Sequence, residues 1–460
     1  MYEEDTIAAI ATAPGEGGVA IVRVSGVDAE NIAAKIFVRP NGKNGEFKSH
    51  RLYHGKICDP ESKRVLDEVL LTIMRNPRSY TGEDVVEIHG HGGAFISRRI
   101  LGLVLAQGAR QAERGEFTKR AFLNGRLDLT QAEGVLDLIR ARTDKGADLA
   151  LHQAGGELSK WVRDLREDLL EILVQVEAAI DFPDEEIELL QRPALKEKIE
   201  RLRAQVSDIL ATYDWGRLFR DGVKVCICGR PNVGKSSLLN ALLGAERVIV
   251  TPVPGTTRDV IEESLDLNGL SAVFWDTAGI HETDEQVESI GVQRSREHLE
   301  KADAVIFVVD GSAPLSAEDR ALFNEIASKK RKLLAINKSD LPQDNALIEE
   351  LKRLHDPREL VCVSAQRGDG IQDLKVKLRE LILDTDAEPS IVITNLRHKS
   401  ALLHGNQALK QALVSLEEKR AAELIAVDLN ETSAALEEII GMVRTDDILE
   451  RIFSDFCIGK

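Results

Sequence analysis

The amino-acid sequence predicts a multidomain protein with an α+β N-terminal domain and an all-α helical domain that is interrupted by an inserted α/β domain. Three observations predict this fold class: short Val- and Ile-rich segments early in the chain, helical periodicity in two separate stretches, and alternating strands and helices between those stretches. We therefore expect an N-terminal domain over 1–120, helical segments over 121–221 and 385–460, and the inserted domain over 222–384.

The composition is typical of several globular cores. Hydrophobic residues make up 43% of the 460 positions, and this length suggests roughly three domains. The net charge of −17 repels nucleic acid at long range, so an RNA partner must meet a local basic patch or a more basic protein. Five scattered cysteines favour a reducing cytosol. No apolar stretch approaches ~18 residues, so we expect no signal peptide, no membrane span and a cytoplasmic location.

The N-terminal domain is predicted from segments that Gly, Pro or Asp residues bound. The expected strands are Thr6–Ala11, Gly18–Val24, Glu68–Met74 and Asp84–His89, and a helix is expected over Ile96–Leu105. Between residues 98 and 126 basic side chains outnumber acidic ones, which makes this segment a candidate for contact with RNA, a partner or a ligand. The basic residues are Arg98, Arg99, Arg110, Arg114, Lys119, Arg120 and Arg126.

The helical domain is predicted from apolar residues at spacings of three and four, which begin near Leu127 and continue to Arg220. Pro183 interrupts the pattern, which resumes over residues 193–213 and again over Leu402–Leu416 and Leu436–Ile440. Between these parts lie five apolar segments that alternate with helical ones, as in a doubly wound α/β domain. The expected strands are Val223–Cys228, Ala272–Trp275, Val305–Val309, Leu333–Ile336 and Val361–Val363.

The strongest motif is the stretch Gly229–Ser236, which fits G-x-x-x-x-G-K-S between an apolar strand and a helix. Its backbone N–H groups can wrap phosphate oxygens, and the following helix N-terminus adds positive potential. Lys235 would reach the β and γ phosphates, and Ser236 would bind Mg²⁺.

Three further motifs follow expected strands in the order typical of GTP-binding domains. Asp276-Thr277-Ala278-Gly279 would hold the Mg²⁺ shell and sense the γ phosphate, and Ser364-Ala365 would close the base pocket. In Asn337-Lys338-Ser339-Asp340 the last carboxylate can accept hydrogen bonds from guanine, which adenine cannot donate. The predicted GTP-binding set comprises Asn232, Val233, Gly234, Lys235, Ser236, Ser237, Thr251, Pro252, Val253, Pro254, Gly255, Thr256, Thr257, Asp276, Thr277, Ala278, Gly279, Asn337, Lys338, Asp340, Ser364, Ala365 and Gln366.

The loop Thr251–Asp259 stands where a first switch loop should. Thr257 is the expected second Mg²⁺ ligand, with Thr256 as the alternative. Arg258 and Asp259 could form a structural ion pair or take part in switching, and the sequence leaves both open. Ile280 follows Gly279 where Ras-like enzymes carry a water-orienting Gln, so another group must orient the attacking water.

Long strings of the sequence resemble the MnmE (TrmE) family of tRNA modification GTPases over essentially the whole chain. They include GEGGVAIVRVSG, TGEDVVEIHGHGG, GEFTKRAFLNGRLDLTQAE, EAAIDFPDEEI, GRPNVGKSS, PGTTRD, DTAG followed by VESIG, and the terminal Cys457-Ile458-Gly459-Lys460. The resemblance implies that K⁺ replaces an arginine finger, with Asn232, Thr251, Val253 and Thr256 as its ligands. It also implies that Glu288 is the catalytic acid that orients water.

The resemblance further implies that the N-terminal domain has a folate-binding-like fold, mediates dimerisation and takes up 5-formyl- or methylene-tetrahydrofolate. The matching positions are Arg23, Glu83, Arg126 and Lys460, although many family members have Lys where Arg126 stands. Cys457 is a candidate for a role in the modification. The expected partners are a second copy of the chain, the flavoprotein MnmG in a heterotetramer or larger assembly, and tRNA.

Two functions remain open from the sequence. The first is a K⁺-dependent GTPase that, with MnmG, adds an aminomethyl or carboxymethylaminomethyl group to C5 of the wobble uridine in certain tRNAs. The second is a regulatory or ribosome-assembly GTPase without nucleoside chemistry, which the GTP-binding motifs alone permit equally well. His89-Gly90-His91 could suggest a metal site, but without further ligands at suitable spacing a structural role is favoured.

Overall fold

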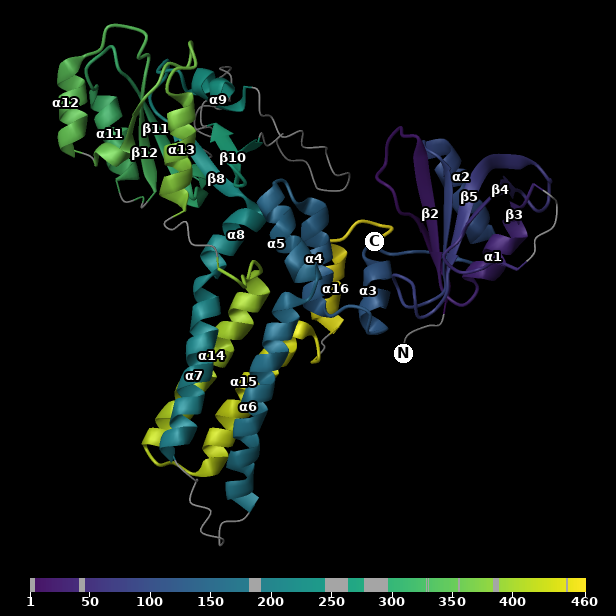
Figure 1. Ribbon diagram of the computed structural model, residues 1–460. Helices are drawn as coiled ribbons and strands as arrows, with labels where there is room; N and C mark the ends of the chain where they lie inside the picture. Colours follow the sequence, from purple (N-terminus) through teal and green to yellow (C-terminus); the bar gives the residue numbers. More distant parts are fainter. Residues whose placement is uncertain are drawn as a thin grey trace. The chain divides into compact units, whose positions relative to one another are not determined.

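The computed structural model describes residues 5–40, 46–181, 192–244, 264–276, 297–327, 329, 331–354, 356–383, 389–443 and 446–460 (Figure 1). The chain forms two compact units. One contains residues 1–136, 152–203 and 404–460, and the other contains residues 137–151 and 204–403. Within the described residues, no helix is both long enough and apolar enough to cross a bilayer.

The first unit begins with a seven-stranded sheet in the order β3-β4-β5-β6-β2-β1-β7. All neighbouring strands are antiparallel except β1 and β7, which are parallel. Helices α1 and α2 lie against this sheet (Figure 1). Their apolar side chains pack with those of one sheet face in a single core. The bounds are β1 Ile7–Ile10, β2 Val19–Ser25, α1 Ala29–Ile36, β3 Phe37–Val38, β4 Leu52–Cys58, β5 Val65–Met74, β6 Val85–His91, α2 Ala94–Ala106 and β7 Arg110–Gln111.

The helices of the first unit pack through apolar stripes. In α6 the residues at spacings of three and four from Leu158 to Val176 are buried, and α6 runs alongside α15, where Arg166 pairs with Glu437 at 2.7 Å. Phe453 packs against both Phe122 and Phe456, which joins the end of the chain to α3. This unit contains all of α3 Glu116–Leu123, α6 Glu157–Asp181, α15 Ala422–Ile440 and α16 Asp446–Ser454. Each unit contains part of α4 Leu129–Arg140, α5 Asp144–Ala154, α7 Arg192–Ala211 and α14 Leu396–Glu417.

The second unit contains a six-stranded sheet in the order β13-β12-β11-β8-β10-β9, parallel except for the edge strand β9. Alternate residues of its central strands enter two cores: Ile306 and Val308 pack with α9 and α13, whereas Phe307 and Val309 pack with α11 and α12. The bounds are α8 Tyr213–Asp221, β8 Val223–Cys228, α9 Lys235–Leu243, β9 Ser264–Asp266, β10 Ser271–Asp276, β11 Ala304–Asp310, α11 Ala317–Ile326, β12 Lys332–Asn337, α12 Asn345–Leu354, a 3₁₀ turn Pro357–Glu359, β13 Leu360–Cys362 and α13 Ile371–Ile382.

The predicted fold class is confirmed: a mixed N-terminal domain, a helical domain and an α/β domain between its parts. Each expected strand is present within a few residues, but β4 and the short β3, β7 and β9 were not predicted. The interruption expected at Pro183 lies outside the described residues. The exact limits of the four segments stay a prediction.

Candidate functional site

The nucleotide-site candidates of the second unit gather at one edge of its sheet. Parallel strands β8, β10, β11, β12 and β13 all end there, and ligands of open α/β sheets bind at the carboxyl ends of the strands. The stretch Gly229–Gly234 follows β8, Asp276 ends β10 and Asn337 ends β12. Ser364 follows β13 by two positions.

The loop after β8 has the backbone that wraps a phosphate. Gly229, Asn232 and Gly234 have φ angles of 148°, 64° and 96°, and positive φ angles of this kind are typical of loops whose N–H groups bind an anion. A side chain at 229 would place its Cβ 2.4 Å from the Val308 carbonyl oxygen, so only glycine fits there. Helix α9 begins at Lys235, immediately after this loop, and adds its N-terminal potential to the site.

Lys235 is held in place by the loop itself. Its Nζ donates to the carbonyl oxygens of Gly229 at 2.8 Å and Arg230 at 2.9 Å, and the residue is only 8% exposed. The ammonium group therefore lies within the curve of the loop, where a β or γ phosphate would be met. Ser236 and Ser237 are exposed at the start of α9, and Asn232 is exposed at the loop.

Asn337 links the phosphate loop to the two loops expected to bind the base. Its Nδ2 donates to the Val233 carbonyl oxygen at 2.8 Å, and its Oδ1 accepts the Ala365 N–H at 3.0 Å. Asn337 is 2% exposed, so these bonds are made in a water-poor environment. The phosphate and base ends of the site are thereby held in one frame.

The Asp340 carboxylate is oriented by Ser364, whose hydroxyl donates to Asp340 Oδ1 at 2.7 Å. This hydrogen bond holds the pKa of the Asp340 carboxyl below its ordinary value, so the group is an ionised acceptor at neutral pH. Ser364 is fully buried, and its Oγ also accepts the Arg367 N–H at 3.1 Å. The side chain of Gln366 is exposed next to this turn.

Several predicted residues lie outside the described part of the chain. They are Thr251, Pro252, Val253, Pro254, Gly255, Thr256, Thr257, Thr277, Ala278, Gly279 and Glu288. Asp276 is described as the last residue of β10, in register with Ile227 of β8. Arg258, Asp259 and Ile280 also lie outside the described part of the chain.

A second cluster lies in the first unit, around the loop Ser79–Glu83 between β5 and β6. The guanidinium of Arg23 and the Nζ of Lys460 lie 5.6 and 5.8 Å from the centre of the Tyr80 ring. Arg23 also pairs with Glu87 at 2.9 Å and donates to the Gly459 carbonyl oxygen at 3.3 Å. Burial, and then the charge of Arg23, lower the pKa of Lys460. The end of the chain thus contacts Arg23 and Tyr80 of the N-terminal domain.

Glu83 and Arg126 both neighbour Gly82, Glu83 as the next residue of the chain and Arg126 through its side chain. A Cβ added at Gly82 would meet Arg126 Cγ at 3.2 Å, so the Arg126 side chain crosses this turn, and it is exposed. Glu83 accepts from the Ser25 hydroxyl at 2.7 Å and lies 3.2 Å from Arg120. Cys457 is exposed, and its carbonyl oxygen accepts the Gly115 N–H at 3.4 Å.

The sequence pattern missed the role of Arg120. We counted it among basic residues available for RNA, but its side chain is 1% exposed and contacts Asp5, Glu83 and Glu116. An arginine buried among three carboxylates cannot contact a nucleic-acid backbone. Arg110, which pairs with Asp5 and Glu116, is also engaged. The basic segment is therefore less available than its composition indicated.

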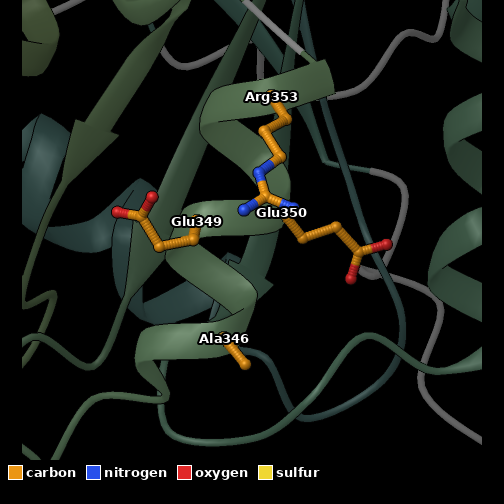
Figure 2. Close-up of a pocket in the computed structure, with 4 residues that line it drawn as sticks. All are labelled: Ala346, Glu349, Glu350 and Arg353. Carbon is orange, nitrogen blue, oxygen red and sulfur yellow. The ribbon is translucent and has the colours of Figure 1, made fainter.

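Two other candidate sites are weaker. His89 lies 3.2 Å from Glu87, and His91 lies 2.6 Å from Asp67; among the described residues no group of three or more His, Cys, Asp or Glu could hold a metal ion. Figure 2 shows a hollow lined by Ala346, Glu349, Glu350 and Arg353. All four come from α12, and Glu350 is paired with Arg320, so the hollow offers no converging set of catalytic groups.

The phosphate loop after β8, the buried Asn337 and the oriented Asp340 define the class of the α/β domain in the second unit: it is the G domain of a P-loop GTPase. Comparison with known proteins supports the class and refines it. The family model of the N-terminus of the GTP-binding protein TrmE matches residues 6–126, and that of the MnmE helical domain matches residues 129–457.

Full-length relatives agree with these models. The tRNA modification GTPase MnmE of Natranaerobius thermophilus is 46% identical over 99% of this chain and 100% of its own length. The protein of the same name from Geobacter sulfurreducens is 47% identical over 100% of both chains. The chain belongs to the MnmE family of tRNA modification GTPases, which confirms the resemblance read from its sequence.

Proposed function

We propose that this protein is a K⁺-dependent GTPase that, together with the flavoprotein MnmG, modifies C5 of the wobble uridine of certain tRNAs. A tetrahydrofolate would supply the one-carbon unit of the carboxymethylaminomethyl or aminomethyl group. The observation that carries the proposal is the presence, in one chain of this family, of a guanine-nucleotide site and a separate cationic cluster in the N-terminal domain. The proposed location is the cytoplasm, where the tRNA substrate is found.

The nucleotide site fits a magnesium–GTP complex. The glycine-rich backbone and Lys235 suit a triphosphate, Asp340 suits guanine, and the exposed Ser236 hydroxyl at the start of α9 suits Mg²⁺. Thr257 is the proposed second Mg²⁺ ligand, and Asp276 would act on the ion through water.

We assign the chemistry of hydrolysis to a K⁺ site beside the phosphates and to one carboxylate. Asn232 has a left-handed backbone and an exposed amide, which can turn its oxygen toward a monovalent cation beside the phosphates. The carbonyl groups of Thr251, Val253 and Thr256 would complete this K⁺ site, which neutralises charge that develops in the transition state. Glu288 would orient the attacking water.

The N-terminal cluster fits a folate. Arg23 and Lys460 supply two cations for a ligand carboxylate, and Tyr80 offers a ring face beside them. Glu83 supplies a carboxylate that could accept from a pterin ring, and the Arg126 side chain lies against the neighbouring Gly82. Cys457 lies two residues before Gly459 of this cluster, which is the basis for a role in the modification. A homodimer through the N-terminal domain, assembled with MnmG and acting on tRNA, completes the proposal.

Analysis of modified nucleosides tests this function. Total tRNA from a strain without the gene should lack the modified wobble uridine, and the wild-type gene should restore it. Lys235→Ala should fail to restore it because the phosphates lose their principal cation. An unchanged wobble uridine in the deletion strain, with the protein copurifying on ribosomal particles and not binding reduced folate, would instead favour the regulatory GTPase.

A further inference from the structure

We propose that Asp310, Gly311 and Gln343 are positioning residues that hold the guanine-reading loop Asn337–Asp340 in its recognition geometry. None of the three belongs to the predicted nucleotide site, and we assign none of them a contact with the base. They act through the backbone and the lysine of the loop. The inference rests on the proposed role of Asp340 as the acceptor for guanine.

The first contact joins the ends of two neighbouring strands. Asp310 ends β11 in register with Asn337, which ends β12. Asp310 Oδ2 accepts from Lys338 Nζ at 2.7 Å, and Oδ1 accepts from the Ser312 N–H and hydroxyl at 3.0 and 2.6 Å. Both carboxylate oxygens are therefore engaged, so the carboxylate presents one fixed oxygen to Lys338.

Lys338 needs such support because of its backbone. Its φ angle is 65°, in the left-handed region that residues with a Cβ disfavour. A residue in this region persists only when its surroundings determine it. The side-chain bond to Asp310 stabilises this conformation from one side of the loop.

The second and third contacts hold the carbonyl groups at Asn337 and Lys338. The Gly311 N–H donates to the Asn337 carbonyl oxygen at 2.8 Å. Gln343 Nε2 donates to the carbonyl oxygens of Lys338 at 2.8 Å and Leu341 at 2.9 Å. The peptide planes before and after Lys338 are thus both fixed.

Glycine at 311 is required for Gln343 to reach this position. A Cβ there would lie 2.3 Å from Gln343 Oε1, 2.9 Å from Ile336 Cγ2 and 3.0 Å from the Asn337 carbonyl oxygen. A side chain at 311 would displace the Gln343 side chain and would press on the Asn337 carbonyl oxygen. Asp340 follows Lys338 by two residues, so a change in the Lys338 backbone redirects the Asp340 carboxylate.

The test compares nucleotides that differ only where Asp340 should read the base. Inosine diphosphate lacks the 2-amino group of GDP. The dissociation constant of inosine diphosphate divided by that of GDP therefore reports the geometry of Asp340. Asp310→Asn, Gly311→Ala and Gln343→Ala in the full chain should each lower this ratio, on the order of tenfold for the loss of one well-placed hydrogen bond. Asp310→Glu keeps the charge and should recover part of the preference. A structural change outside the base-binding loop would weaken the binding of both nucleotides equally and leave the ratio unchanged.

Two controls make the outcomes distinct. Arg320→Ala removes a cation of α11 that pairs with Glu350, and it should keep the wild-type ratio. Asp340→Asn should abolish the preference for GDP over inosine diphosphate; if it does not, the base-reading assignment itself fails. If Asp340→Asn abolishes the preference but the three variants keep the wild-type ratio, the supporting role is wrong while the assignment stands. Gln343 is half-buried, so Gln343→Ala should fold. If Gly311→Ala does not fold, the ratio measured for Gln343→Ala still tests the positioning role.

Discussion

Replacing Asn337 by Ala should destabilise the G domain and weaken nucleotide binding together. The change removes the bond to the Val233 carbonyl oxygen and the bond from the Ala365 N–H. Each hydrogen bond contributes about 0.5–1.5 kcal/mol net, and each buried group left without a partner costs about 1–3 kcal/mol. Because some water can reach the emptied space, we expect a loss of about 2–4 kcal/mol in the free energy of unfolding.

Calorimetry of the full chain can measure this loss. The transition that shifts when GDP is added reports the G domain, because only a folded site binds the nucleotide. For a domain of this size, a loss of about 2–4 kcal/mol corresponds to a decrease of roughly 4–16 °C in its transition temperature. The affinity for GDP should fall as well, since the phosphate loop and the base loops are no longer tied.

Two further variants bracket the result. Asn337→Asp keeps an acceptor for the Ala365 N–H but places an oxygen against the Val233 carbonyl, so it should destabilise the domain too. Asn345→Ala removes an exposed amide at the start of α12 and should change neither quantity. If Asn337→Ala leaves the GDP-responsive transition at the wild-type temperature, Asn337 does not tie the site together and the reasoning is refuted.

Three other predictions concern hydrolysis and stability. Glu288→Ala should keep GTP binding, measured with a fluorescent nucleotide, but lose turnover; retained turnover would reject its role. Hydrolysis should be fast in K⁺ and slow in Na⁺, and Asn232→Ala should remove the difference; equal wild-type rates in the two salts would dismiss the cation mechanism. Burial raises the pKa of Glu116, but hydrogen bonds from Arg110, the Glu113 N–H and Arg120 outweigh it and hold the pKa below 4.5. The stability that Glu116 contributes is therefore present above pH 4.5 and is lost as the pH falls through the lower pKa of the folded state. The free energy of unfolding of Glu116→Gln should consequently fall less steeply with decreasing pH than that of the wild type. An unchanged dependence on pH would contradict this.

The elements that local patterns determine could be predicted from the sequence. Strand β8 has the predicted bounds because an apolar run ends at a glycine-rich motif. Strand β4 was missed because only Gly55 and Ile57 in it are buried, while His54 and Lys56 face outward. The motifs also placed Lys235, Asn337 and Asp340 at one sheet edge.

Contacts between distant residues could not be predicted in this way. Lys338 has a left-handed backbone and hydrogen bonds to Asp310 and Gln343, and no local pattern in the sequence indicates that geometry. Arg120 stood in a basic segment, yet Asp5 and Glu83 bury it from 115 and 37 residues away. From charge composition alone, Arg120 is expected to be a surface cation, whereas the fold buries its side chain.

The preference for guanine over xanthine tests the central claim most directly. Xanthine has an oxygen where guanine has its 2-amino group, so an Asn amide at 340 would complement xanthine as the Asp340 carboxylate complements guanine. Calorimetric titration of wild type and Asp340→Asn with GDP and xanthosine diphosphate should show the preference reversed in the variant. If both proteins prefer GDP to the same degree, Asp340 does not read the base and the assignment of this site is wrong.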